Sequence, residues 1–80
     1  MRLCYVHSIY TRLRRLLSIL RKRSRPFSIN DVRLILAHNT HLGLRASLSS
    51  ARRAVATFLA SKEIRLTGQT TDTRAVLYVA

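Results

Sequence analysis

The sequence has few of the residues that build disulfide-rich or metal-bound small domains, and it has few acids. Cys4 is its one cysteine, so a single chain can form neither a disulfide framework nor a four-cysteine metal site. No apolar run approaches the roughly 20 residues that a membrane-spanning helix needs. The start of the chain does not resemble a signal peptide, because polar residues interrupt its apolar stretch. Asp31, Glu63 and Asp72 are the acids, and they are too scattered for paired catalytic carboxylates or a metal-dependent nuclease.

Motifs of catalytic and cofactor-binding proteins are also missing. There is no Ser–His–Asp order, no glycine-rich phosphate loop and no deaminase signature. His38 and His41 are three positions apart, but no cysteine or acid lies close to them in sequence, and zinc normally takes three or four ligands. We therefore expect no enzymatic activity, cofactor, metal or small-molecule substrate, and we expect structural or turn roles for the histidines.

Positive charge is the strongest feature that is present. The 80 residues include 15 Lys and Arg against 3 acids, which gives a formal net charge of +12. Only Lys22 and Lys62 are lysines, and arginine is the better bidentate ligand for phosphate and for guanine edges. A chain this basic attracts polyanions, because neutralising phosphates releases condensed counterions. The charge predicts a nucleic-acid partner, although an anionic membrane surface would attract it too.

Hydrophobic periodicity predicts one domain that begins with two helices. A long amphipathic helix is expected over residues 3–23, with an apolar stripe comprising Val6, Ile9, Leu13, Leu16, Leu17 and Leu20. Pro26 ends the basic stretch that follows, so residues 24–27 are expected to be a short connection. A second helix is expected over residues 28–39, with Ser28 as its N-cap and Asp31 in its first turn.

A third helix and a hairpin complete the predicted order. The third helix is expected over residues 48–62, capped by Ser47 or Ser49, after a turn at about 39–47 that contains Gly43. Its apolar face is centred on Val55 and comprises Leu48, Ala51, Val55, Phe58 and Leu59. A β-hairpin is expected over residues 64–79, with strands at 64–67 and 74–79 and a polar loop at 68–73, where Asp72 is expected to organise the turn.

This order of three helices and a hairpin, with an alanine-rich third helix, resembles the winged helix-turn-helix family over residues 3–80. The resemblance implies an α+β fold in which the third helix enters the DNA major groove and the hairpin, or wing, touches the adjacent backbone. It also implies a small transcriptional regulator of bacterial, archaeal or phage type. The turn at 39–47 is longer than that of a minimal helix-turn-helix.

A helical wheel selects the residues expected to contact double-stranded DNA. Opposite Val55 the third helix is small and polar around one long cation, so Ser49, Ser50, Arg53 and Thr57 are expected to read bases, with Ala60 on the same face. Arg65 and Arg74 are expected to flank the hairpin loop, with Thr70, Thr71 and Thr73 at its tip. The residues expected to contact the DNA backbone are Arg23, Arg25, Arg45, Arg52, Arg65 and Arg74.

The sequence leaves other partners open. The same basic surfaces would suit RNA or a structural role in a ribonucleoprotein. A third reading is a protein-interaction or membrane-surface module that uses the basic helix in residues 3–25. A homodimer is an open alternative to a monomer, with any uncovered part of the first helix as its contact. The expected location is cytoplasmic or nucleoid-associated.

Overall fold

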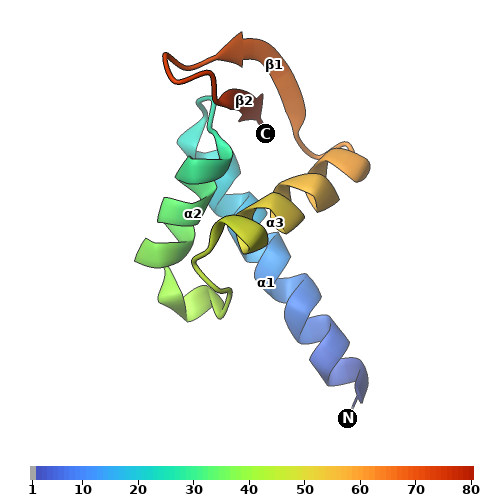
Figure 1. Cartoon of the computed structure of the whole chain (residues 1–80). Coiled ribbons are helices and arrows are strands. Elements are labelled where there is room, and N and C mark those ends of the chain that lie inside the picture. Colours follow the sequence, from blue (N-terminus) through green and yellow to red (C-terminus); the bar gives the residue numbers. More distant parts are fainter. Residues whose placement is uncertain (1) are drawn as a thin grey trace.

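Three helices are followed by an antiparallel hairpin, the α+β arrangement expected of a winged helix-turn-helix (Figure 1). The structure is a computed structural model that describes residues 2–80, with side chains from Ile9 onward. The elements, in chain order, are α1 (Arg2–Arg23), α2 (Ile29–His38), a 3₁₀ turn (Thr40–Leu42), α3 (Leu48–Ala60), β1 (Arg65–Thr70) and β2 (Val76–Val79). The predicted fold class is confirmed.

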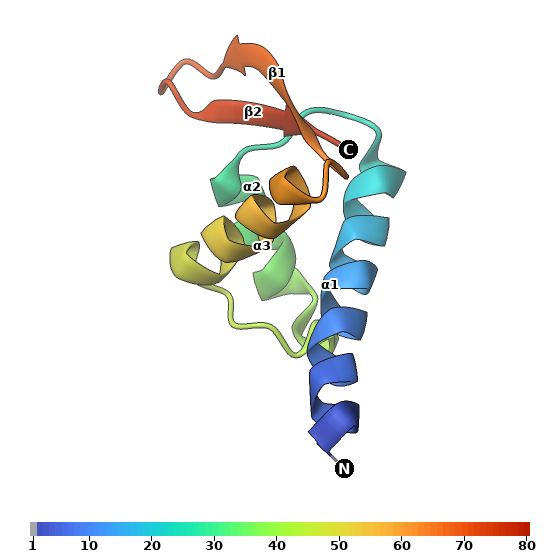
Figure 2. The same ribbon diagram turned by 90° about the vertical axis from the view of Figure 1, so that its right-hand side faces the viewer.

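The C-terminal half of α1 packs in the core, and its other end extends past the rest of the molecule (Figure 2). Leu16, Leu17 and Leu20 are each no more than 1% exposed, as the predicted stripe requires. Ile9 was expected in the same stripe, but it is 42% exposed, because it lines a groove that is open to water. The predicted stripe residue Val6 lies outside the described side chains.

Helix α2 begins where the sequence predicts, because Ser28 and Asp31 form a reciprocal capping box. The Ser28 backbone N–H donates to Asp31 Oδ2 at 2.9 Å, and the Asp31 N–H donates to Ser28 Oγ at 3.2 Å. Two of the otherwise unpaired donors at the helix start are thereby satisfied. Val32, Ile35 and Leu36 then enter the core on one face.

The connection between α2 and α3 covers residues 39–47 and is as long as expected. Asn39 closes α2 by donating its side-chain amide to the Ile35 carbonyl at 2.7 Å, and the 3₁₀ turn follows. Gly43 ends that turn in the left-handed region, with φ of +74°. Its carbonyl accepts a hydrogen bond from Arg12 Nη1 at 3.4 Å. The connection is thus tied to α1.

Helix α3 is capped by Ser47, whose Oγ accepts the Ser50 N–H at 3.2 Å. The centre predicted for its apolar face is wrong by an angle of roughly 50° around the helix axis, which is half the angle between successive residues. Ala51 and Ala54 are 0% and 3% exposed, whereas Leu48 is 45% exposed. The small alanines let α3 approach the other helices closely, so packing buries them in preference to the larger leucine.

The hairpin has a longer first strand and a later turn than predicted. Strand β1 continues to Thr70 through an irregularity between Leu66 and Thr70, and the turn lies at residues 71–75. Thr71 holds this turn: its N–H donates to the Ala75 carbonyl at 3.0 Å, and its hydroxyl accepts the Ala75 N–H at 3.1 Å. The turn-organising role expected of Asp72 therefore belongs to Thr71.

Strand β2 is also bound to the segment just before α2. Phe27 and Tyr78 exchange backbone hydrogen bonds of 2.9 and 2.8 Å, and their rings lie 6.1 Å apart. Phe27 is fully buried and Tyr78 is 8% exposed. Residues 24–27 form the short connection that the sequence predicts, and Phe27 at its end also pairs with β2 and fixes the hairpin to the start of α2.

Candidate nucleic-acid interface

The outer face of α3 is formed by small residues around Arg53. On a helical wheel, Ser49 and Ala60 lie directly opposite the buried side chains of α3. Arg53 lies about 30° to one side of them, and Ala56 lies about 30° to the other side. All four residues are exposed. Short side chains allow a nucleic-acid groove to approach the helix closely, and Arg53 is long enough to reach into it. This part of the predicted reading face is present on the surface.

Ser50 and Thr57 lie on one flank of α3 and not at its centre. Thr57 is exposed, about 70° from the outward direction, and Ser50 is about 90° from it. Ser50 is half-buried, and its Oγ accepts a hydrogen bond from Ser47 Oγ at 3.2 Å. The expectation that Ser50 lies directly opposite the apolar stripe is wrong, because the buried face is centred between Ala54 and Val55 and not on Val55.

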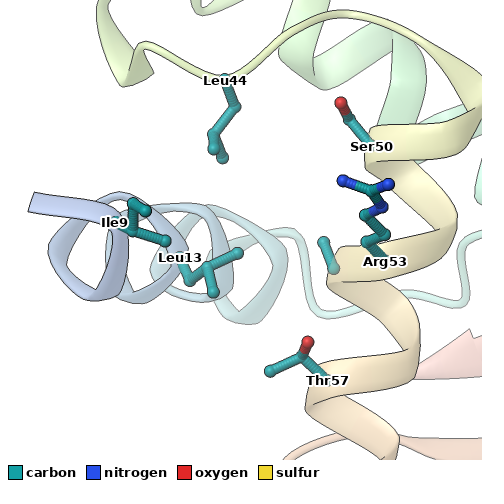
Figure 3. A pocket seen from close by; sticks show the side chains of 7 residues that line it. Ile9, Leu13, Leu44, Ser50, Arg53 and Thr57 are labelled. Carbon is teal, nitrogen blue, oxygen red and sulfur yellow. The ribbon is translucent and has the colours of Figure 1, made fainter. Parts of the chain in front are cut away.

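That flank of α3 faces the N-terminal half of α1 across an open groove of about 260 Å³. Figure 3 shows Ser50, Arg53 and Thr57 along α3, with Ile9 and Leu13 of α1 on the other side of the space. The full lining is Ile9, Leu13, Leu44, Ser50, Arg53, Ala54 and Thr57. Arg53 therefore borders both the outer face and the groove.

Arg52 lies on the opposite flank, where α3 meets the wing. It is exposed, and it shares a shallow hollow with Asn30 at the start of α2 and with Ala75 and Val76 of the hairpin. A phosphate placed there would have the Arg52 guanidinium on one side and the wing on the other. The position suits the backbone contact predicted for Arg52.

The two wing arginines are at opposite ends of the hairpin. Arg74 lies in the turn, with φ of +63° and its N–H donating to the Thr71 carbonyl at 2.8 Å. Arg65 pairs with Val79 at the base of the hairpin, so the expectation that it flanks the loop is wrong. The cause is the extra length of β1. The turn, and with it Arg74, lies on the same side of the molecule as α3, away from α1 (Figure 2).

The other predicted backbone contacts are exposed but less close to α3. Arg45 is in the connection just before the Ser47 cap. Arg23 ends α1, and Arg25 lies in the loop that leads to α2. Figure 2 shows the C-terminal end of α1 on one side of the molecule and α3 with the wing turn on the other. The structure thus places Arg52 and Arg53 on α3, Arg45 just before it and Arg74 in the wing turn, and it sets the end of α1 apart from them.

The three acids are all placed away from the outer face of α3. Asp31 belongs to the capping box of α2, and Asp72 lies in the wing turn. Glu63 follows α3 and forms an ion pair with Arg14 of α1, with Arg21 at 4.0 Å. The hydrogen bond from Arg14, followed by the one from the Ser61 hydroxyl, holds the pKa of Glu63 below its ordinary value. A nucleic acid approaching Arg53 would meet no carboxylate beside it.

Glu63 is the residue of this region that sequence reasoning missed. Its ion pair joins α1 to the start of the wing, and Arg14 also lies over the Tyr10 ring, 5.4 Å from the centroid. The sequence does contain a signal for this ion pair. Glu63 is one of three acids in a chain of +12 charge, so it is expected to attract a nearby arginine. The identity of that arginine depends on how α1 packs, which periodicity does not specify.

The described residues contain neither a cluster of metal-ligating side chains nor a membrane-spanning helix. No group of three or more His, Cys, Asp or Glu side chains is arranged to hold a metal ion within the part of the chain that the structure describes. Within the same residues, no helix is both long enough and apolar enough to cross a bilayer. His38 and His41 are exposed at the end of α2 and in the 3₁₀ turn.

Comparisons with known proteins give no family for the chain. No protein-family model matches the sequence, no curated protein matches it, and no solved structure matches the fold.

Proposed function

We propose that this protein is a sequence-specific DNA-binding protein that reads a groove with α3 and holds the flanking backbone with its wing. The observation that carries the proposal is the outer face of α3. Arg53 stands there among Ser49, Ala56 and Ala60, in a chain of +12 charge whose three acids all lie elsewhere. An exposed arginine among small side chains suits bidentate contact with guanine O6 and N7.

The layout around α3 supports contacts to phosphates as well. Arg52 lies on the wing side of the helix, Arg74 lies in the wing turn itself, and Arg45 precedes the N-terminus of α3. The N-terminus of α3 itself offers backbone N–H groups and a partial positive charge to a phosphate. The winged helix-turn-helix arrangement gives such proteins a helix and a hairpin that contact adjacent parts of one duplex. Regulation of transcription is the biological role that we infer from this.

The proposal is tested by selecting bound duplexes from a random pool at physiological salt. We expect a motif to be enriched, and a symmetric motif would report binding as a dimer. Arg53→Ala should then lose preference at one base pair, at a cost of about 1–3 kcal/mol. The matched control is Arg15→Ala, an exposed arginine on α1. This variant should weaken binding to DNA of every sequence by the same factor. If Arg53→Ala selects the same motif with the same strength as the parent, the assignment of Arg53 is wrong.

RNA is the second candidate, and one observation favours it. Most of the exposed cations lie on α1 and in the loops, while α3 contributes only Arg52 and Arg53. Charge spread in this way attracts any polyanion, structured RNA included. Competition between duplex DNA and structured RNA over a salt series separates the two. RNA that displaces duplex DNA at equal concentration, together with no enriched DNA motif, would replace DNA by RNA as the partner.

A further inference from the structure

We infer that the groove between α1 and α3 binds a small amphipathic carboxylate, and that this ligand opposes DNA binding by engaging Arg53. The groove is a feature separate from the outer face of α3, although the two share this arginine. The opposition between ligand and DNA rests on the proposed function. Binding of the carboxylate does not, because the groove and its charge are present in the protein alone.

The walls of the groove are apolar and open to water. Ile9 and Leu13 of α1 form one wall, and Leu44 and Ala54 contribute from the connection and from α3 (Figure 3). Ile9 is 42% exposed, and Leu13 and Leu44 are only half-buried. An apolar ligand body in this space would remove these side chains from water, which is the main favourable term for such binding.

Polar groups line only the α3 side of the groove. Ser50, Arg53 and Thr57 are spaced three and four positions apart, so they follow one another along a single side of the helix. Ser50 Oγ accepts a hydrogen bond from the Ser47 hydroxyl, so the hydroxyl proton of Ser50 is available to a ligand oxygen. A ligand that fits therefore has an apolar body toward α1 and hydrogen-bond acceptors toward α3.

The acceptor should be an anion, because Arg53 has no carboxylate within reach. All three acids of the chain are placed elsewhere: Asp31 in a helix cap, Glu63 with Arg14, and Asp72 in the wing turn. A guanidinium and a carboxylate form two parallel hydrogen bonds, which are stronger beside apolar walls than in open water. Within the described residues, the groove therefore offers one unneutralised cation for one ligand anion.

The volume of the groove indicates the size of ligand that it can cover. A space of about 260 Å³ filled at the density of a protein interior holds a molecule of about 190 Å³, on the order of a dozen heavy atoms. Bicyclic aromatic carboxylates and fatty acids of medium chain length are of this size. A ligand bound to Arg53 would withdraw that side chain from DNA. By linkage, DNA would then weaken the ligand by the same factor.

The test is a titration of the full-length protein with 2-naphthoate, without DNA, followed by amide chemical shifts and calorimetry. We expect saturable binding with shifts at Leu44 and Ala54, and binding at least about tenfold weaker for the neutral alcohol 2-naphthalenemethanol. Acetate, which has no apolar body, should not saturate. Arg53→Gln should weaken 2-naphthoate about tenfold or more while leaving the weak binding of the alcohol unchanged.

Ile9→Ser tests the apolar wall, with Leu34→Ser as the matched control. The two side chains are 42% and 41% exposed, and Leu34 does not line the groove. Ile9→Ser should weaken 2-naphthoate severalfold and Leu34→Ser should not. A second experiment adds 2-naphthoate to the complex with a selected duplex, where the parent should lose DNA affinity and Ile9→Ser should lose much less.

Several results overturn the inference. One is the lack of saturable binding by 2-naphthoate, and another is binding that Arg53→Gln and Ile9→Ser leave unchanged. A third is self-association that Ile9→Ser abolishes while 2-naphthoate does not bind, which would assign the groove to a second copy of the chain. The outcomes separate from those for the proposed function. Ligand binding with no selected DNA motif refutes the DNA proposal and the opposition that rests on it, but not the ligand site. A motif with no ligand binding refutes only the ligand site.

Discussion

Enlarging two alanines of α3 tests the packing that places its outer face. Ala51 is 0% exposed in the core, whereas Ala54 is 3% exposed and also borders the groove. Ala51→Leu would force three extra carbon atoms into a filled core, and overpacking of this kind costs about 1–3 kcal/mol. Ala54→Leu can extend into a space of about 260 Å³. It should therefore stay within about 1 kcal/mol of the parent.

The assay is urea unfolding followed by circular dichroism at fixed salt, together with thermal unfolding. In a domain of this size, 1 kcal/mol corresponds to a change in Tm of about 4–8 °C. The Ala51→Leu variant should therefore unfold at a lower urea concentration and a lower temperature than the Ala54→Leu variant. Leu48→Ala should cost only about 1 kcal/mol, because that leucine is already 45% exposed. If both enlarged variants are equally destabilised, or if Leu48→Ala costs more than Ala51→Leu, the buried face described for α3 is wrong.

The cap of α3, the turn at Gly43 and the ion pair of Glu63 each contribute to the stability of the fold. Ser47→Ala should cost about 0.5–2 kcal/mol in urea unfolding because it removes the cap of α3, and Ser49→Ala should cost almost nothing. Gly43→Ala should cost about 1 kcal/mol, because φ is +74° there and a Cβ would lie 3.0 Å from Arg12 Nε, and retained parental stability would contradict this. The lowered pKa of Glu63 stabilises the fold at neutral pH, and this contribution is lost as the pH falls from the ordinary pKa of a glutamate through the lowered one. Glu63→Gln should lower the free energy of unfolding at pH 7, and that free energy should then fall less on acidification than it does in the parent. An unchanged dependence of stability on pH would refute the role of the ion pair.

Much of the fold follows from local signals in the sequence. Ser28 with Asp31 specifies the start of α2, and Gly43 marks a position that needs a positive φ. The order of helices and hairpin is also readable, because periodicity changes from helical to alternating after α3. These features depend on neighbours a few positions apart, so the sequence alone carries them.

The errors come from contacts between distant segments. The pairing of Phe27 with Tyr78 joins the start of α2 to β2, and nothing local in either segment indicates it. The burial of Ala54 and the exposure of Leu48 depend on how closely the neighbouring helices approach α3. A hydrophobicity scale ranks leucine above alanine and so rotates the predicted face. That rotation is the reason why Ser50 was expected outside and lies half-buried beside the groove.

The corrected face changes how charge on α3 can be used. Arg52 and Arg53 are adjacent in sequence, so they point about 100° apart around the helix axis. Arg52 is directed toward the wing, and Arg53 toward the outer face and the groove. A ligand in the groove can therefore engage one arginine while the other keeps its place beside the wing. Such a protein would lose discrimination between sequences before it lost its general attraction to DNA, because most of its positive charge lies outside α3.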